Sequence, residues 1–369
     1  MEELRPGDIV HKAVQGRNGV VMLEAGAVLT KHYIERLRAL GFRSIAIRTR
    51  RGDGMPEEGA FDPSVIDRMK DNAEERERMA DAVRSFIESD RTFASLTLPY
   101  AEAARFRREF RERVLGTLSQ RPLAEELTVL RQTDPQWFEH ALQVSLLANM
   151  AGDANLWDGS RLQELTVGSL LFDIGMTRLP EKLVRAKRKW TEEERRLVRQ
   201  HTQLGFKVLA DIREVPLQAA RAALLHHERY SGEGYPFAFK GKDIPELAQI
   251  IGLADVYDAL LSPRHHRDPY PGNEATEYLF AAGNYEFGIE IIQLFLKHVA
   301  ALPISSVVLL SSGQLGVVES SDQRPAHRPL IRIVREADGE LAKESYLIDL
   351  SQHRRLVVVR SFPRGNPPA

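Results

Sequence analysis

The segment from His226 to Leu260, HHERYSGEGYPFAFKGKDIPELAQIIGLADVYDAL, constrains this chain more than any other. Two adjacent histidines precede a Gly-Tyr-Pro turn, and Asp255 follows inside an apolar run. An ionised carboxylate is costly to bury unless it is paired or bound to a metal. Histidine and carboxylate ligands together suit divalent transition ions such as iron and manganese. The segment therefore predicts a metal site beside a loop that can admit a substrate.

Composition limits the class of protein. The chain has 369 residues, 43% of them hydrophobic, which is enough for two or three globular domains. Its formal net charge is −1, which predicts neither DNA nor a membrane as a partner. No apolar run is long enough to span a bilayer and no leader precedes the first domain, so we expect a cytoplasmic protein. The absence of cysteine excludes disulfides, thiolate ligands and cysteine nucleophiles.

The segment resembles the signature of the HD-GYP domain, the metal-dependent phosphodiesterase branch of the HD superfamily that acts on cyclic di-GMP. Gly234-Tyr235-Pro236 matches the triplet that names the domain. Upstream, the run from Leu171 to Gly175 stands where the family has its His-Asp doublet followed by Ile-Gly-Lys. The resemblance covers about residues 125 to 300 and implies an all-helical core.

The resemblance also implies a set of metal ligands. Each histidine taken singly is more often an ordinary core or surface residue, and only the complete set favours a metal site. The implied ligands are His140, Asp173, His201, His226, His227 and Asp255. In the family, two or three ions share a bridging aspartate and a hydroxide that attacks phosphorus. The nitrogen and oxygen ligands favour iron or manganese, although histidine-rich sites also accept zinc.

Four positions depart from the family pattern. Phe172 replaces the histidine of the doublet, Met176 the lysine after it, Gln136 a glutamate and Ser231 an aspartate. Phenylalanine cannot bind a metal ion. We therefore expect one firm ion site, with Asp173, His201, His226 and His227, and a weaker second site that keeps only His140, Asp173 and Asp255.

The remaining site predictions concern catalysis and substrate. The predicted catalytic residues are Asp173, Tyr235 and Arg178, where Arg178 would replace the lost lysine charge. Guanidinium groups suit phosphate oxygens geometrically. The predicted substrate contacts are Gly234, Tyr235, Pro236, Arg264 and Arg267. Asp258, one turn after Asp255, is interpreted as a structural residue.

The chain is predicted to be a multidomain, mainly α protein. Residues 1–50 read as a small α/β module for regulation or docking, and residues 51–60 as a linker. Residues 61–124 read as helices, residues 125–302 as the HD-GYP core, and residues 303–362 as a small β-rich subdomain, because apolar β-type runs there alternate with turns. Thr191 and Glu194 form a capping-box pattern that starts the helix carrying His201, and residues 247–261 predict an apolar helix carrying Asp255.

Apolar residues recur at a helical period in the segment from Asp62 to Gln120. They are Ile66, Met69, Met79, Val83, Phe86 and Ile87. Such a stripe usually means packing within one chain. A homodimer through the helices of residues 61–120 is the functional alternative.

Two classes of function remain open. One is a phosphodiesterase that hydrolyses cyclic di-GMP to the linear dinucleotide or GMP, which the retained ligands favour. The other is a degenerate receptor for a cyclic dinucleotide, or an interaction module for a signalling protein, which Phe172, Met176 and Ser231 favour. A different HD-type phosphohydrolase is a third reading.

Overall fold

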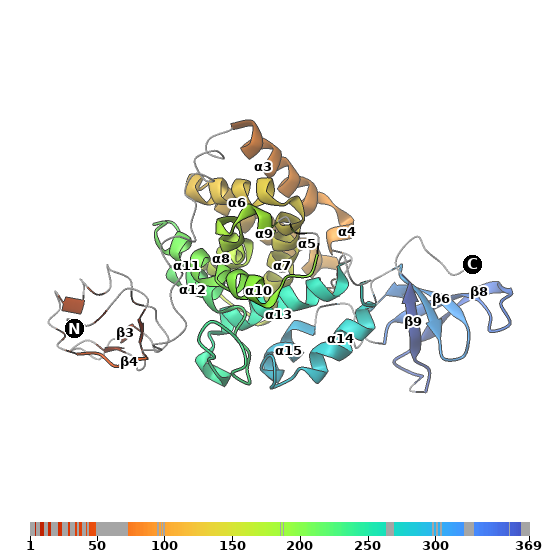
Figure 1. Ribbon diagram of the computed structural model, residues 1–369. Helices are drawn as coiled ribbons and strands as arrows, with labels where there is room; N and C mark the ends of the chain where they lie inside the picture. The colour runs from red at the N-terminus through yellow and green to blue at the C-terminus, as the bar shows by residue number, and fades with distance from the viewer. Residues whose placement is uncertain are drawn as a thin grey trace.

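The computed structural model describes most of the chain from residue 73 onward (Figure 1). The described residues are 73–93, 96, 98, 100–184, 186, 188–262, 269–296, 299, 302, 305–320, 328–353 and 355–362, with scattered positions between 4 and 48. The predicted linker at 51–60, together with Ile66 and Met69, lies outside them. The fold class is confirmed as a helical core accompanied by a C-terminal antiparallel sheet.

Helices make up the body between residues 73 and 296. In chain order they are α3 (Ala73–Glu88), α4 (Asp90–Phe93), α5 (Tyr100–Leu118), α6 (Arg121–Thr133), α7 (Pro135–Ala154), α8 (Gly159–Leu171), the 3-10 turn η1 (Ile174–Arg178), α9 (Glu181–Val184), α10 (Glu192–Arg199), α11 (His201–Ala210), α12 (Leu217–Leu225), the 3-10 turn η2 (Gly241–Asp243), α13 (Glu246–Leu261), α14 (Gly272–Ala281) and α15 (Ile289–Leu296). No described helix is both long and apolar enough to cross a bilayer.

The centre of the body is formed by α7, α8, α12 and α13. These helices are apolar around most of their circumference, as helices inside a core must be. Their buried side chains belong to one continuous hydrophobic cluster that also includes residues of α3, α5 and α6. The predicted helix over residues 247–261 is confirmed, because α13 spans Glu246–Leu261. The predicted capping box is also confirmed at the start of α10, but the expectation that this helix carries His201 is wrong, because α10 ends at Arg199 and His201 begins the separate helix α11.

The apolar stripe of α3 faces this core. Met79, Val83 and Ile87 are buried against the core cluster, and Phe86 packs on it partly buried. The packing interpretation is therefore confirmed for the described part of the stripe. Since one chain already covers these side chains, they do not need a partner, and the homodimer remains an untested prediction.

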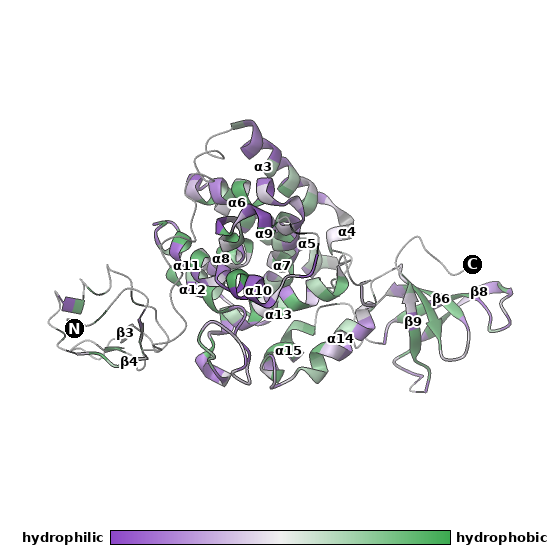
Figure 2. Ribbon diagram, viewed as in Figure 1, coloured by the Kyte–Doolittle hydropathy of each residue, from purple (hydrophilic) through white to green (hydrophobic). Residues whose placement is uncertain are grey.

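The C-terminal sheet has five antiparallel strands in the order β8-β7-β6-β5-β9. The strands are β5 (Val307–Leu310), β6 (Leu315–Ser320), β7 (Leu330–Arg335), β8 (Leu341–Asp349) and β9 (Val358–Phe362). Alternate residues of β5 and β7 are buried in a separate small core, as expected for a sheet with one covered face. Figure 2 shows hydrophobic stretches in β6 and β9, in contrast to the polar α10.

The described N-terminal positions form two small strand pairs. They join β1 (Ile9–Val10) to β4 (Ile47–Arg48) and β2 (Val14–Gln15) to β3 (Val21–Leu23). Ile34, Leu37 and Arg38 are helical, and Ile34 and Leu37 are buried with Val10 in a small apolar cluster. The described positions are thus both strand and helix, and the bounds and the role of the predicted α/β module remain predictions.

Candidate metal centre

Asp173 and His201 come together because two backbones approach closely. Asp173 lies between the C-terminal end of α8 and η1, and His201 begins α11. A Cβ added to Gly175 in η1 would lie 1.9 Å from the carbonyl oxygen of His201. Only glycine therefore allows η1 to pack on α11 at this point. The result is that Asp173 Oδ1 lies 3.2 Å from His201 Nε2.

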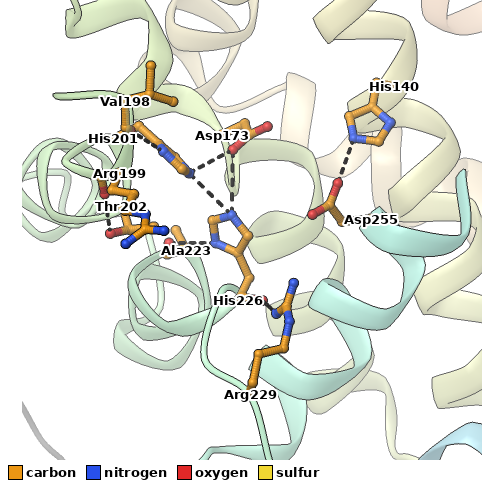
Figure 3. A network of polar contacts seen from close by, with 10 residues as sticks. All are labelled: His140, Asp173, Val198, Arg199, His201, Thr202, Ala223, His226, Arg229 and Asp255. Atoms are coloured by element: carbon orange, nitrogen blue, oxygen red, sulfur yellow. Dashed lines mark hydrogen bonds and ion pairs between the residues drawn. The ribbon is translucent and has the colours of Figure 1, made fainter. Parts of the chain in front are cut away.

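A second close approach positions His226. This residue follows the last turn of α12, and α13 crosses it at Gly252. A Cβ on Gly252 would lie 2.2 Å from the carbonyl oxygen of His226. The contact brings α12 and α13 together, one turn before Asp255. His226 Nε2 then lies 3.6 Å from Asp173 Oδ1 (Figure 3).

Backbone carbonyls determine which nitrogen of each histidine faces the centre. His201 Nδ1 lies 2.7 Å from the carbonyl oxygen of Val198, and His226 Nδ1 lies 2.8 Å from that of Ala223. A carbonyl oxygen can only accept, so each Nδ1 must carry hydrogen and donate it. In the neutral ring the lone pair is then on Nε2. This fixing of the tautomer by a backbone acceptor is typical of histidines that bind metals.

The donor atoms converge on one point. His201 Nε2 and His226 Nε2 are 3.4 Å apart, and with His227 and Asp173 they form a group whose ligand atoms all lie within 4.8 Å of one another. Two ligand atoms about 2.1 Å from one ion are roughly 3.0–3.4 Å apart at ordinary coordination angles. Four electron-rich donors that face one another without a cation would repel. The residues present therefore fit a divalent metal ion.

The pKa shifts at the group differ between its members: burial opposes a charge on His201, but the Asp173 carboxylate outweighs burial and raises the pKa of His201, whereas the pKa values of Asp173 and His227 are lowered. Burial on its own raises the pKa of Asp173, but the hydrogen bonds and charges of His201 and His226 outweigh burial and hold it well below its usual range. Burial and the neighbouring histidines lower the pKa of His227 well below the ordinary value. An ionised aspartate and a neutral histidine are the forms that bind metals.

His140 forms a second group with two carboxylates. Its Nε2 lies 3.0 Å from Asp255 Oδ1, and its Nδ1 lies 2.6 Å from Asp258 Oδ2. Burial opposes a charge on the ring, but the hydrogen bonds to Asp255 and Asp258 outweigh burial and raise the pKa of His140 to about 10. Asp258 was interpreted from sequence as structural, and the structure places it against a predicted ligand. The spacing between Asp255 and Asp258 could have indicated that both contact His140, because residues three apart on a helix share a face.

Phe172 lies between the two groups. Its ring makes an edge contact with His226 at 5.0 Å and with His140 at 5.8 Å, measured between ring centroids. The side chain is fully buried. Figure 3 shows His140 and Asp255 set apart from Asp173, His201 and His226. The Phe172 ring therefore places apolar surface between the His140 group and the Asp173 group, at the position where a histidine nitrogen could have served as a ligand for an ion between them.

The Gly-Tyr-Pro loop is attached to the first group by Tyr235 and Glu228. The Tyr235 ring stacks on His227, with centroids 4.6 Å apart and an angle of 24° between the planes. Burial and the charges of Asp173 and Asp255 raise the pKa of Tyr235, so the phenol stays protonated. The buried carboxylate of Glu228 accepts hydrogen bonds from the backbone N–H groups of Phe237, at 2.7 Å, and Phe239, at 2.9 Å. Glu228 therefore holds the loop after the triplet.

Two further predictions have different outcomes. Arg178 is buried, and its guanidinium lies 2.6 Å and 2.7 Å from the carboxylate oxygens of Glu126 on α6. Its charge is already neutralised there, and we do not assign it a catalytic role. Arg264 and Arg267 lie outside the described residues.

Family comparisons agree with this geometry. Residues 126–289 match the model of the HD domain, and residues 307–365 match that of the KOW domain associated with HD domain. Residues 126–289 are therefore similar to the HD domain, and the predicted family resemblance is confirmed for this part of the chain.

The relatives include named phosphodiesterases. The cyclic di-GMP phosphodiesterase PA4108 of Pseudomonas aeruginosa is 27% identical over 337 residues, which cover 86% of this chain and 80% of that protein. A cyclic di-GMP phosphodiesterase of Thermotoga maritima is 30% identical, over 44% of this chain and 45% of that protein. The 3'3'-cGAMP-specific phosphodiesterase 2 of Vibrio cholerae is also 30% identical, over 46% of this chain and 32% of that protein. The chain thus matches less than half the length of the last two proteins.

Proposed function

We propose that this protein is a metal-dependent phosphodiesterase that hydrolyses cyclic di-GMP to the linear dinucleotide or GMP. The observation that carries the proposal is the convergence of Asp173, His201, His226 and His227 beside the loop of Tyr235. The named activities of the relatives support a cyclic dinucleotide as the substrate class.

An ion held by this group supplies Lewis-acid stabilisation of phosphoryl oxygens and lowers the pKa of bound water. The surrounding residues orient the group. The carbonyls of Val198 and Ala223 fix two histidine tautomers, and Glu228 holds the loop that carries Tyr235. The Tyr235 hydroxyl is a protonated donor, able to give a hydrogen bond to a phosphate oxygen or a base.

Phe172 favours a second candidate, a receptor that binds a cyclic dinucleotide without turnover. The ring removes one ligand and separates His140 from the four-residue group. With fewer ligands for a second ion, the site would lack part of the charge stabilisation that such an ion would supply at the leaving oxygen. Binding without hydrolysis is the result that distinguishes this candidate from the enzyme.

The test uses the full chain, purified without oxygen in the presence of iron or manganese. Cyclic di-GMP is incubated with the protein, and the products are separated by chromatography. We expect metal-dependent formation of the linear dinucleotide or GMP, and its loss in the His226→Ala/His227→Ala double variant. A metal-loaded protein that binds cyclic di-GMP without product supports the receptor. Faster hydrolysis of 3'3'-cGAMP would change the substrate but keep the reaction class.

A further inference from the structure

Arg199 is held over the Gly-Tyr-Pro loop by an aromatic contact. Its guanidinium carbon lies 5.2 Å from the ring centroid of Tyr235, whose own ring stacks on His227. Arg199 is the last residue of α10, two positions before His201. The Tyr235 ring therefore contacts both the guanidinium of Arg199 and a residue of the metal group. The residue is exposed, so its outer face is open to a ligand.

The neighbouring arginines already have partners. Arg229 donates to the carbonyl oxygens of His226 and Glu228 and lies 3.5 Å from a carboxylate oxygen of Glu286. On α10 itself, Arg195 lies 3.4 Å from Glu192. Within the described part of the chain, Arg199 has no carboxylate at ion-pair distance. An exposed cation–π contact stabilises only weakly and leaves the N–H groups of the guanidinium available.

We propose that Arg199 binds the phosphodiester of the cyclic dinucleotide that is not being cleaved, an inference that rests on the proposed function. A cyclic dinucleotide has two phosphodiesters, separated by a ribose on either side of the ring. The four-residue group is suited to the phosphate that reacts, which leaves the other negative charge without a partner. The planar fork of arginine can donate two parallel hydrogen bonds to its oxygens.

The position of Arg199 also explains how the loop and α10 act together. Tyr235 contacts both the guanidinium of Arg199 and the ring of His227, so the loop links the cation to the metal group. Arg199 is therefore a specificity-determining residue for ligands with two phosphates. Inorganic phosphate, which needs only the metal group, does not depend on it.

The test compares Arg199→Gln with Arg196→Gln in the full-length, metal-loaded protein. Arg196 is an exposed arginine on the same helix, so the control removes the same charge three residues away. Affinity for cyclic di-GMP is measured as KM and kcat if the protein turns over, and as a calorimetric Kd if it does not. Affinity for inorganic phosphate and the metal content are measured on the same samples.

We expect Arg199→Gln to weaken cyclic di-GMP binding about tenfold or more, the effect of losing hydrogen bonds to a charged group. The affinity for inorganic phosphate and the metal content of Arg199→Gln should stay within about twofold of the parent, as should the cyclic di-GMP affinity of Arg196→Gln. The cyclic di-GMP affinity of Arg199→Lys should be intermediate.

Equal weakening of cyclic di-GMP and phosphate binding in Arg199→Gln would overturn the proposal, because it would mean damage to the metal group. Unchanged cyclic di-GMP affinity in Arg199→Gln would overturn it while leaving the enzyme proposal intact. A parent that binds but does not hydrolyse cyclic di-GMP would sink the enzyme proposal alone, and a parent that does neither would overturn both.

Discussion

At the scale of single residues, the contacts made by Phe172 and Asp258 are the part of this site that the sequence did not predict. The retained ligands could be predicted from the family resemblance, because each stands at a recognisable motif position. The sequence also predicted that Phe172 withdraws a ligand. It could not predict that the ring contacts both His140 and His226, since that depends on how α7, α8 and α12 pack. The hydrogen bond from His140 to Asp258 likewise depends on the packing of α7 on α13.

Restoring the missing nitrogen should change how much metal the protein binds. In Phe172→His, an imidazole would lie between His140 and His226, so we expect the metal content to rise from about one ion per chain towards two, with faster hydrolysis. Elemental analysis and product formation on the same sample measure both effects. Phe172→Leu is the control, because it changes the shape of the core without adding a ligand. A folded Phe172→His protein with unchanged metal content would show that this position does not limit the site.

The His140 group predicts a pH dependence for the metal-free protein. The folded pKa of His140, about 10, lies above the ordinary value of 6.5. The protonated ring therefore contributes stability that is fully present below pH 6.5 and is lost as the pH rises through about 10. Asp258→Asn removes one of the two carboxylates and should lower the pKa of His140 markedly. Nuclear magnetic resonance titration of the His140 ring measures this change in pKa, and the exposed Asp211→Asn variant is the control. An unchanged pKa of His140 in Asp258→Asn would mean that Asp258 does not interact with the charged ring.

At the scale of elements, helix ends and one loop assemble the site. Asp173, His201 and His226 lie at the ends of α8, α11 and α12, where local backbone carbonyls and close glycine contacts orient them. Local signals predicted the elements themselves, such as the capping box of Thr191 and Glu194. Local signals could not show that Arg178 would be neutralised by Glu126, because the two residues are 52 positions apart in sequence.

Removing the anchor of the Gly-Tyr-Pro loop should destabilise the protein and release the loop. In Glu228→Ala, the N–H groups of Phe237 and Phe239 lose their acceptor, and an unpaired buried polar group costs about 1–3 kcal/mol. We expect a loss of roughly 2 kcal/mol in the free energy of unfolding, measured with a chemical denaturant. Glu233→Ala, which removes an exposed carboxylate from the same loop, is the control. Equal stability of the two variants would contradict the anchoring role.

At the scale of the whole molecule, the helical core holds the proposed metal centre, and no described residue of the two flanking modules belongs to that group. Sequence predicted this division, because apolar helical periods give way to β-type runs after residue 303. The described strands agree, and β5 to β9 form the five-stranded sheet. The order of these strands was not predictable, since local patterns indicate strands without indicating their partners.

The most direct test of the metal centre is elemental analysis of the full-length protein, purified without oxygen with iron and manganese supplied. We predict at least one firmly bound transition ion per chain, and its loss from a folded His226→Ala/His227→Ala variant, because ligand changes commonly reduce metal affinity by more than the about 10- to 100-fold seen for outer residues. Circular dichroism checks that the variant keeps its helices. A parent protein that remains metal-free, or a double variant that keeps the same metal content, would contradict the assignment of Asp173, His201, His226 and His227 as a metal centre.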